Sequence, residues 1–176
     1  ALTPIFIQYP NLFLTIVGAG ELEASLHAEV EALNLSERVV FEGVIPADKI
    51  PARLAAADLL VLPSRWDGWG LVVNEAFAAG VPVIVSDCCG AADLIDHGVN
   101  GYVFRSERVN ELRDCVFDFL NRETDRSSLA KNASEMGNRI STELAAPYFI
   151  ACLKHVLGLS PQKPIPPWSV TKMTAP

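Results

Sequence analysis

Short apolar stretches alternate with amphipathic segments along most of the chain. Residues 12–18, LFLTIVG, form a nearly continuous apolar run, which predicts a strand buried on both faces, and DLLVLP at 58–63 predicts a second one. Residues 21–34 carry leucine and valine at helical spacing with charges on the opposite side, which predicts an amphipathic helix. Further strands are predicted at 38–43, 81–87 and 101–104, and further helical segments at 46–57, 71–79, 91–98, 107–122, 125–138 and 142–157.

This alternation predicts an α/β fold, a Rossmann-like parallel sheet with helices on both faces. We expect one domain over residues 1–158 and a proline-rich, extended tail over 159–176, which holds five prolines. Ligands of such sheets bind beyond the carboxyl ends of the strands. The loops that lie there are 18–21, 43–47, 64–70 and 86–92.

Composition narrows the function classes. Half of the 176 residues are hydrophobic and a fifth are charged, which is typical of a folded domain. The formal net charge of −7, with the basic residues scattered, argues against a nucleic-acid partner. The sequence has neither an apolar run long enough to span a membrane nor a signal peptide, so we expect a cytoplasmic protein.

Cysteine and histidine give no sign of a metal site. Four cysteines are present, of which Cys88 and Cys89 are adjacent, and no CxxC spacing occurs. The three histidines lie far apart in the sequence. We therefore expect reduced thiols and no metal.

A glycine pair follows the first predicted strand. Gly18 and Gly20 resemble the start of a dinucleotide-binding GxGxxG fingerprint, and Glu42 lies where a ribose-binding acid would stand. The third glycine of that fingerprint is replaced by Glu23, which prevents the close helix–strand packing that glycine allows. This substitution disfavours nicotinamide or flavin binding.

The sequence SRWDGWGLVVNEAFAAG, residues 64–80, is the strongest candidate site. Pro63 and Ser64 end a strand, and Gly68 and Gly70 permit the backbone turn into a predicted helix that should stop at Gly80. The exposed N–H groups and the dipole of such a helix N-terminus suit a diphosphate. Asp67 precedes the turn and Glu75 lies about 8 Å further along the helix, so one acid can hold a sugar and the other a ribose.

Plainer interpretations of the same residues remain open at this point. Asp67 can be a turn or capping residue, and Glu75 an exposed helical acid. Trp66 and Trp69 can face a ligand or another domain, or they can cap the edge of the sheet. The two acids are too far apart for a retaining glycosidase, whose carboxyl groups lie about 5 Å apart.

The stretch PSRWDGWGLVVNEAFAAGVPVIVSD resembles the signature of the retaining glycosyltransferases of family four, the "group 1" transferases of the GT-B fold. Asp67 and Glu75 keep the E-x7-E spacing of that signature. The resemblance extends over residues 5–157 and includes DHGVNGYVF, which is similar to a later family segment.

The resemblance implies a role for each matching position. Glu75 would bind the nucleotide ribose, and Asp67 would face the donor sugar and the reacting centre. Backbone groups would make the remaining donor contacts: Gly68, Trp69, Gly70 and Leu71 to sugar hydroxyls and diphosphate, and Gly18, Gly43, Val44, Ile45 and Pro46 to the nucleotide.

The chain departs from the family pattern in two respects. Asp67 stands where the family has glutamate, so the side chain is one methylene shorter. The family's first strand and the Arg/Lys pair that clamps the diphosphate are not found, so the chain resembles the C-terminal donor-binding half of a GT-B enzyme without its N-terminal acceptor domain.

The implied activity is transfer of a hexose from a nucleoside diphosphate sugar to a glycan or lipid-linked acceptor, without metal or other cofactor. We expect this portion to be inactive alone and its tail and Trp168 to pack toward the N-terminal domain. For the whole enzyme the resemblance allows peripheral association with membranes. The rival hypothesis is a non-catalytic nucleotide-binding or scaffolding module of the same fold, which Asp67 favours. A response-regulator-like domain is disfavoured because Asp87 lacks a neighbouring acidic pair.

Overall fold

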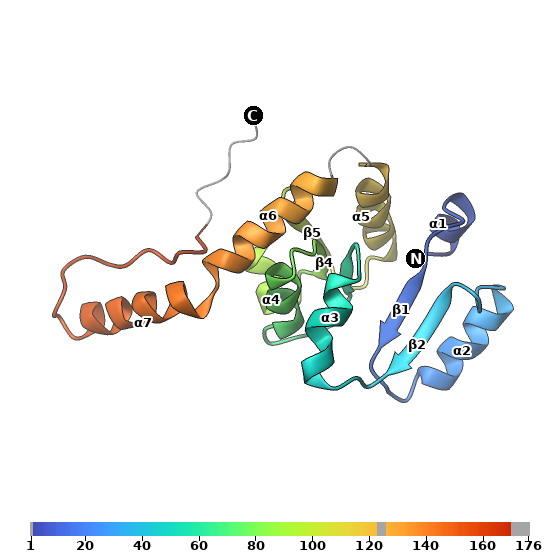
Figure 1. Cartoon of the computed structure of the whole chain (residues 1–176), viewed down its shortest axis with the longest axis horizontal. Coiled ribbons are helices and arrows are strands. Elements are labelled where there is room, and N and C mark those ends of the chain that lie inside the picture. The colour runs from blue at the N-terminus through green and yellow to red at the C-terminus, as the bar shows by residue number, and fades with distance from the viewer. Residues whose placement is uncertain (1, 123–125, 170–176) are drawn as a thin grey trace. The chain divides into compact units, whose positions relative to one another are not determined.

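The structure is a computed structural model that describes residues 2–122 and 126–169. The chain divides into two compact units, Ala1–Ile50 and Pro51–Pro176. The strands form two parallel sheets, β1-β2 in the first unit and β3-β4-β5 in the second (Figure 1). The predicted α/β class with parallel strands is therefore confirmed.

The first unit contains α1 (Thr3–Gln8), β1 (Leu14–Val17), α2 (Glu23–Ala32), β2 (Val39–Gly43) and the 3-10 turn η1 (Ala47–Lys49). Its small core is formed by Phe6, Leu35 and Val39. Arg38 closes α1 onto this core, since its guanidinium lies 5.0 Å from the centre of the Phe6 ring and donates a 2.8 Å hydrogen bond to the Phe6 carbonyl.

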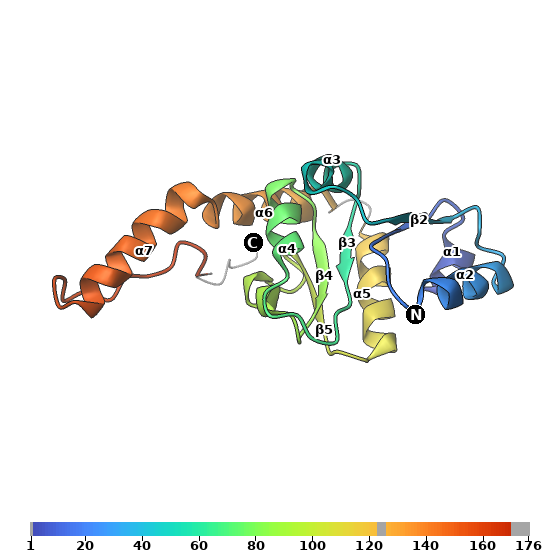
Figure 2. The same ribbon diagram turned by 90° about the horizontal axis from the view of Figure 1, so that it is seen from below.

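The second unit contains α3 (Ile50–Ala55), which begins at the unit boundary, β3 (Leu60–Leu62), α4 (Leu71–Ala78), β4 (Val83–Ser86), the 3-10 turn η2 (Gly90–Leu94), β5 (Gly101–Phe104), α5 (Val109–Asn121), α6 (Arg126–Arg139) and α7 (Thr142–Val156). Figure 2 shows α5 on one face of the three-stranded sheet and α4 on the other. Helices thus pack on both faces of this sheet, as the alternating pattern predicts.

The prediction that the strands at 12–18 and 58–63 are buried on both faces is wrong. β1 is half-buried and Val17 is 44% exposed, and every residue of β3 is half-buried. The central strand β4, by contrast, is buried throughout. Burial follows position in the sheet, because β1 and β3 each pair with one described strand whereas β4 is paired on both sides.

The single helix predicted at 46–57 is instead a 3-10 turn followed by α3. Pro51 explains the break, because it has no N–H to donate to the carbonyl of Ala47 four residues earlier. The helical segment predicted at 91–98 is the shorter 3-10 turn η2, which ends at Leu94. The remaining predicted helices are confirmed within about two residues at each described end. Residue 125 and residues 170–176 lie outside the described residues.

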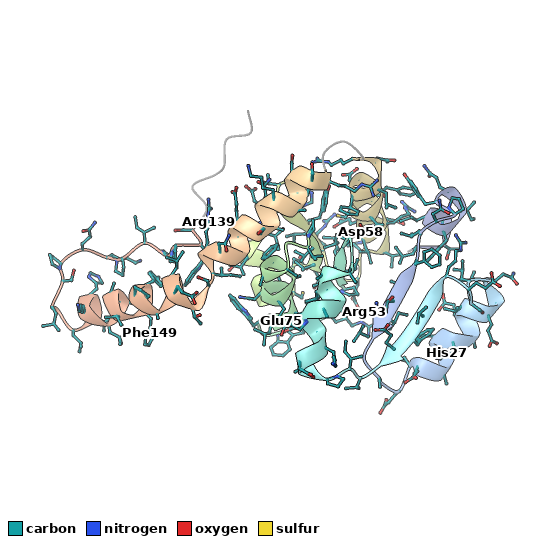
Figure 3. All side chains as sticks on the ribbon, viewed as in Figure 1. His27, Arg53, Asp58, Glu75, Arg139 and Phe149 are labelled. Atoms are coloured by element: carbon teal, nitrogen blue, oxygen red, sulfur yellow. The ribbon has the colours of Figure 1, made fainter. Side chains whose placement is uncertain are left out.

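The described part of the tail lies against α7. The ring of Trp168 meets that of Tyr148 edge to face at 5.0 Å between centroids, and Nδ1 of His155 lies 3.0 Å from the carbonyl oxygen of Ser160. Trp168 thus has an aromatic partner within this chain, and its packing toward a further domain stays a prediction. Other apolar residues of α7, among them Phe149 (Figure 3), are exposed.

Gly137 allows α6 to lie directly on the helix that carries the candidate site. A Cβ at this position would lie 2.6 Å from the carbonyl carbon of Phe77 and 2.9 Å from the backbone nitrogen of Ala78, both in α4. We expect Gly137→Ala to lower the free energy of unfolding by about 1–2 kcal/mol, because the overpacking cost exceeds the helix propensity that alanine gains. Urea denaturation measures this difference.

Gly20→Ala is the matched control, because a Cβ there meets no atom within 4 Å. It should change the free energy of unfolding by less than about 0.5 kcal/mol. A Gly137→Ala variant as stable as the parent chain would contradict the close approach of α4 and α6.

Cys115 of α5 makes stability depend on alkaline pH. Burial, reinforced by the charges of Asp118, Asp114 and Glu111, raises the pKa of this thiol from 9.0 to about 11. The folded state therefore holds the proton more tightly than the unfolded state, and this contribution is present below pH 9 and lost as the pH rises toward 11. We expect Cys115→Ala to show a smaller loss of thermal stability between pH 9 and 11 than the parent chain. An identical pH profile in the two proteins would contradict this assignment.

Candidate functional site

The loop between β3 and α4 depends on the backbone of Gly70. This residue caps the N-terminus of α4 with φ of +84°, a left-handed conformation that glycine adopts without strain. A Cβ there would collide with Sγ of Cys89 and lie 3.1 Å from Cδ2 of Leu62. The predicted end of the helix is also confirmed, because α4 stops at Ala78 and Gly80 has φ of +73°.

Asp67 is half-buried and takes part in the turn itself. Its Oδ1 accepts a 3.0 Å hydrogen bond from the backbone N–H of Trp69, two residues on. This is an Asx-turn, in which the carboxylate replaces a backbone carbonyl. The plainer interpretation of Asp67 as a turn residue therefore describes one of its oxygens. Within the described part of the chain, Oδ2 has no hydrogen-bond partner.

The two tryptophans of the loop are not core residues. Trp66 is 81% exposed, which argues against its capping the edge of the sheet. Trp69 is partly exposed, and its indole Nε1–H donates a 2.9 Å hydrogen bond to Oδ1 of Asn74 in α4. Asn74 thus supports the loop, a role that the sequence pattern does not predict.

The N-terminus of α4 keeps its positive potential. The N–H of Val73 is bonded to the carbonyl of Gly70, whereas the N–H groups of Leu71 and Val72 have no acceptor within the helix. The first turn of α4 carries no acidic side chain to offset the dipole. Such a terminus favours an anion in its vicinity.

Glu75 is the fifth residue of α4 (Figure 3) and is half-buried. It lies about 6 Å along the helix axis from Leu71 at the usual rise per residue. The second unit thus brings five of the expected donor-site residues together at the carboxyl end of β3 and the start of α4. They are Asp67, Gly68, Trp69, Gly70 and Leu71, with Glu75 about one turn further along.

The first unit brings the other expected residues together in the same way. The N–H of Gly18 donates a 2.7 Å hydrogen bond to the carbonyl of Gly43, so the ends of β1 and β2 lie side by side. Both glycines have positive φ, at +122° and +63°. The chain then continues through the exposed Val44 and half-buried Ile45 to Pro46, which caps η1. Contact of this loop with a nucleotide stays a prediction.

The geometry around Gly18 disfavours a dinucleotide-binding site at the start of α2. Helix α2 begins at Glu23, which places a carboxylate in the first turn of the helix. A negative charge there opposes a pyrophosphate at the helix N-terminus.

The loop after β4 contributes contacts that the sequence pattern does not predict. The pattern places loop 86–92 at the ligand edge of the sheet and indicates only reduced thiols at Cys88 and Cys89. In the structure Asp67 and Cys89 form an isolated parallel bridge, and Sγ of Cys89 donates to the carbonyl of Trp69 at 3.1 Å. Burial, with a further contribution from the charge of Asp67, raises the pKa of Cys89, which keeps this thiol protonated as a donor. The sequence signal for this contact is Gly90, which follows Cys88 and Cys89 and permits the close approach of another backbone.

Residues 2–122 and 126–169 contain no group of three or more histidine, cysteine, aspartate or glutamate side chains placed to hold a metal ion. No helix within these ranges is both long enough and apolar enough to cross a membrane.

Two characterised relatives of this chain are both named as enzymes that transfer a sugar. In an alignment 127 residues long that covers 68% of the chain, it is 33% identical to the GDP-mannose-dependent alpha-(1-6)-phosphatidylinositol monomannoside mannosyltransferase of Mycobacterium tuberculosis. Over 121 residues, or 69% of the chain, it is 31% identical to the alpha-D-kanosaminyltransferase of Streptomyces kanamyceticus. The chain spans 33% and 31% of the length of these two relatives, about a third of each.

Solved structures show the same fold. The Anabaena protein HepE in complex with UDP matches with a TM-score of 0.74 and 27% identity, covering 90% of this chain and 44% of that one. The C-terminal domain of a glycosyl transferase group 1 family protein from Francisella tularensis matches with a TM-score of 0.72 at 22% identity, covering 78% and 73% of the two chains. This second likeness concerns the fold alone.

The family profile described as "Glycosyl transferases group 1" matches residues 2–136. This range includes both glycine loops, the whole of α4 and the loop after β4. The chain therefore belongs to the group 1 glycosyl transferase family.

Proposed function

We propose that this chain is the donor-binding portion of a retaining glycosyltransferase, which moves a hexose from a nucleoside diphosphate sugar to a glycan or lipid-linked acceptor. One observation carries the proposal: α4 presents an N-terminus without acidic residues between Asp67 and Glu75. This arrangement offers an anion site with one carboxylate on each side.

The names of the relatives support a nucleotide-sugar donor. The mycobacterial relative is named as dependent on GDP-mannose, and Anabaena HepE has been crystallised with UDP and with UDP-glucose. These donors share a nucleoside diphosphate joined to a sugar but differ in base. The nucleoside diphosphate and the sugar attached to it are therefore the donor features that the proposed site recognises.

Each group of the site has a role in this proposal. Glu75 accepts hydrogen bonds from the ribose hydroxyls, while Gly18 and the loop from Gly43 to Pro46 provide main-chain contacts to the nucleotide. The backbone of residues 68–71 holds the sugar hydroxyls and the diphosphate. As the bond to the sugar breaks, negative charge grows on the departing diphosphate, and the N–H groups of Leu71 and Val72 with the α4 dipole stabilise it. This proposal requires no metal, because the helix and the family's basic pair supply the positive charge.

Asp67 has a divided role in the proposed site. Its Oδ1 maintains the turn, which leaves Oδ2 to accept a hydrogen bond from the donor sugar. The same hydrogen bond also favours a second candidate function, a non-catalytic nucleotide-binding module in which Asp67 serves the turn alone. The variants described below distinguish the two functions.

Removing the Glu75 carboxylate tests donor binding. For the full-length protein we expect Glu75→Ala to weaken binding of UDP-glucose or GDP-mannose at least tenfold, because hydrogen bonds to a charged group contribute about 1.5–3 kcal/mol. Isothermal titration calorimetry with each donor measures the change. Glu135→Ala, which removes a helical carboxylate of α6 outside the site, is the control and should bind like the parent. Unchanged binding in Glu75→Ala, or no binding by the parent protein, would contradict the proposal.

Three substitutions at Asp67 separate its turn role from a role in chemistry. Asp67→Asn keeps an oxygen acceptor for the Trp69 N–H but removes the charge, so we expect near-normal stability and a sugar-transfer rate at least tenfold lower. Asp67→Ala should lose both stability and activity, and Asp67→Glu should retain activity. Transfer of radiolabelled sugar and thermal unfolding give the two readouts. Full activity of Asp67→Asn would favour the turn-only role.

The 176 residues alone should show no turnover of a nucleotide sugar, because the proposed acceptor site lies in another domain. Measurable transfer by this chain would contradict that part of the proposal.

A further inference from the structure

We propose that the segment Cys88–Ala91 sets the backbone of the loop at residues 67–70, and that Cys89 and Gly90 are positioning residues for the donor site. The expected effect on donor binding rests on the proposed function. The positioning of the loop rests only on contacts within the second unit.

Three backbone hydrogen bonds join the two segments although they lie some twenty residues apart in the sequence. The N–H of Asp67 donates to the carbonyl of Cys88 at 3.0 Å, and the N–H of Gly90 donates to the carbonyl of Asp67 at 3.1 Å. The N–H of Ala91 donates to the carbonyl of Trp69 at 2.6 Å. The loop is therefore paired residue by residue with a second segment, beyond the support of its own Asx-turn.

The thiol of Cys89 adds a fourth bond at the end of this pairing. Cys89 is 3% exposed, and its Sγ donates to the same Trp69 carbonyl that accepts from Ala91. A carbonyl oxygen has two lone pairs, and both are now used. The peptide between Trp69 and Gly70 consequently has a fixed orientation. Because C=O and N–H of a trans peptide point in opposite directions, the Gly70 N–H is directed away from Cys89.

Steric contact requires glycine at one position of each segment, residue 70 in the loop and residue 90 in the segment after β4. A Cβ on Gly90 would lie 2.5 Å from the carbonyl oxygen of Gly68, and a Cβ on Gly70 would collide with Sγ of Cys89. The space beside Gly70 and Gly90 thus accommodates a hydrogen atom on each Cα but no Cβ. A side chain at residue 70 or 90, or a larger one at residue 89, has to displace the loop that carries Asp67 and begins α4.

The pairing with Cys88–Ala91 determines how precisely the donor-contact groups of the loop are placed. The loop supplies four of the predicted contact residues, and a shift of about 1 Å in such groups strongly affects binding and rate. Cys89 touches no donor in this proposal; it acts through the Trp69 carbonyl and the Gly70 peptide. A hydroxyl can replace the thiol as donor, whereas a methyl group cannot.

The first experiment compares variants of the full-length protein by calorimetry with UDP and with GDP as probes. We expect Cys89→Ala to raise the dissociation constant of the bound nucleotide at least fivefold and Cys89→Ser to stay within about twofold of the parent. Cys115→Ala is the matched control, because Cys115 is also buried but lies in α5. It should lower the unfolding temperature without changing the dissociation constant.

Two results would overturn the positioning role. The first is nucleotide binding by Cys89→Ala that equals binding by the parent. The second is equal weakening of nucleotide binding in Cys115→Ala and Cys89→Ala, since this would mean a general loss of stability. Gly90→Ala provides an independent variant, because it displaces the loop from the other segment. We expect it to weaken binding at least as strongly as Cys89→Ala.

The second experiment requires no ligand. Hydrogen–deuterium exchange of the same variants should show faster exchange in peptides that cover residues 66–71 for Cys89→Ala, but not for Cys89→Ser or Cys115→Ala. If the parent protein binds neither probe, the proposed function fails while this measurement still decides the positioning role. Unchanged exchange at residues 66–71 in Cys89→Ala would refute it.

Discussion

The contact between α4 and α6 is possible only because Gly137 has no side chain where the two helices approach. A methyl group there would overlap the backbone of Phe77 and Ala78. This approach fixes the far end of α4, while Phe77 and Val73 of the same helix are fully buried. The position of α4 then determines where its N-terminus, and with it the candidate anion site, can lie.

The N-terminus of α4 is held in place by the backbone of the loop that precedes it. Gly70 turns the chain in a left-handed conformation against Cys89, and the preceding loop is paired with the segment after β4. The fully buried Ser86 contributes as well, because its hydroxyl donates to the carbonyl of Ser64 at the start of the loop. Helix and loop are thus anchored to the same central strand, so a disturbance of β4 reaches both. Rigid support of this kind is what a site built from backbone groups requires, since its donors cannot reorient as side chains do.

Asp67 illustrates how one residue can serve both structure and chemistry. An aspartate is short enough for its Oδ1 to accept from the N–H two residues on. A glutamate at this position, as the family signature has, reaches one methylene further. The departure from the family pattern therefore has a local structural counterpart, the Asx-turn that holds Trp69. Trp69 is itself tied to α4 through Asn74, which adds a side-chain link between the loop and the helix that follows it.

The sequence by itself determined the order and type of nearly all elements, because hydrophobic periodicity and glycine placement are local properties. It also determined that Gly70, the acids and the start of α4 would occur together, since they are neighbours in the chain. Burial could not be read in this way: LTIV in β1 and VIVS in β4 are similar strings, but only β4 has a described strand on each side. The pairing of Asp67 with Cys89 and the approach of Gly137 to Phe77 were equally hidden, because they join residues 22 and 60 positions apart. Contacts of that range are decided only when the sheet register and the helix packing are set, so the tertiary structure alone determined what holds the site in place.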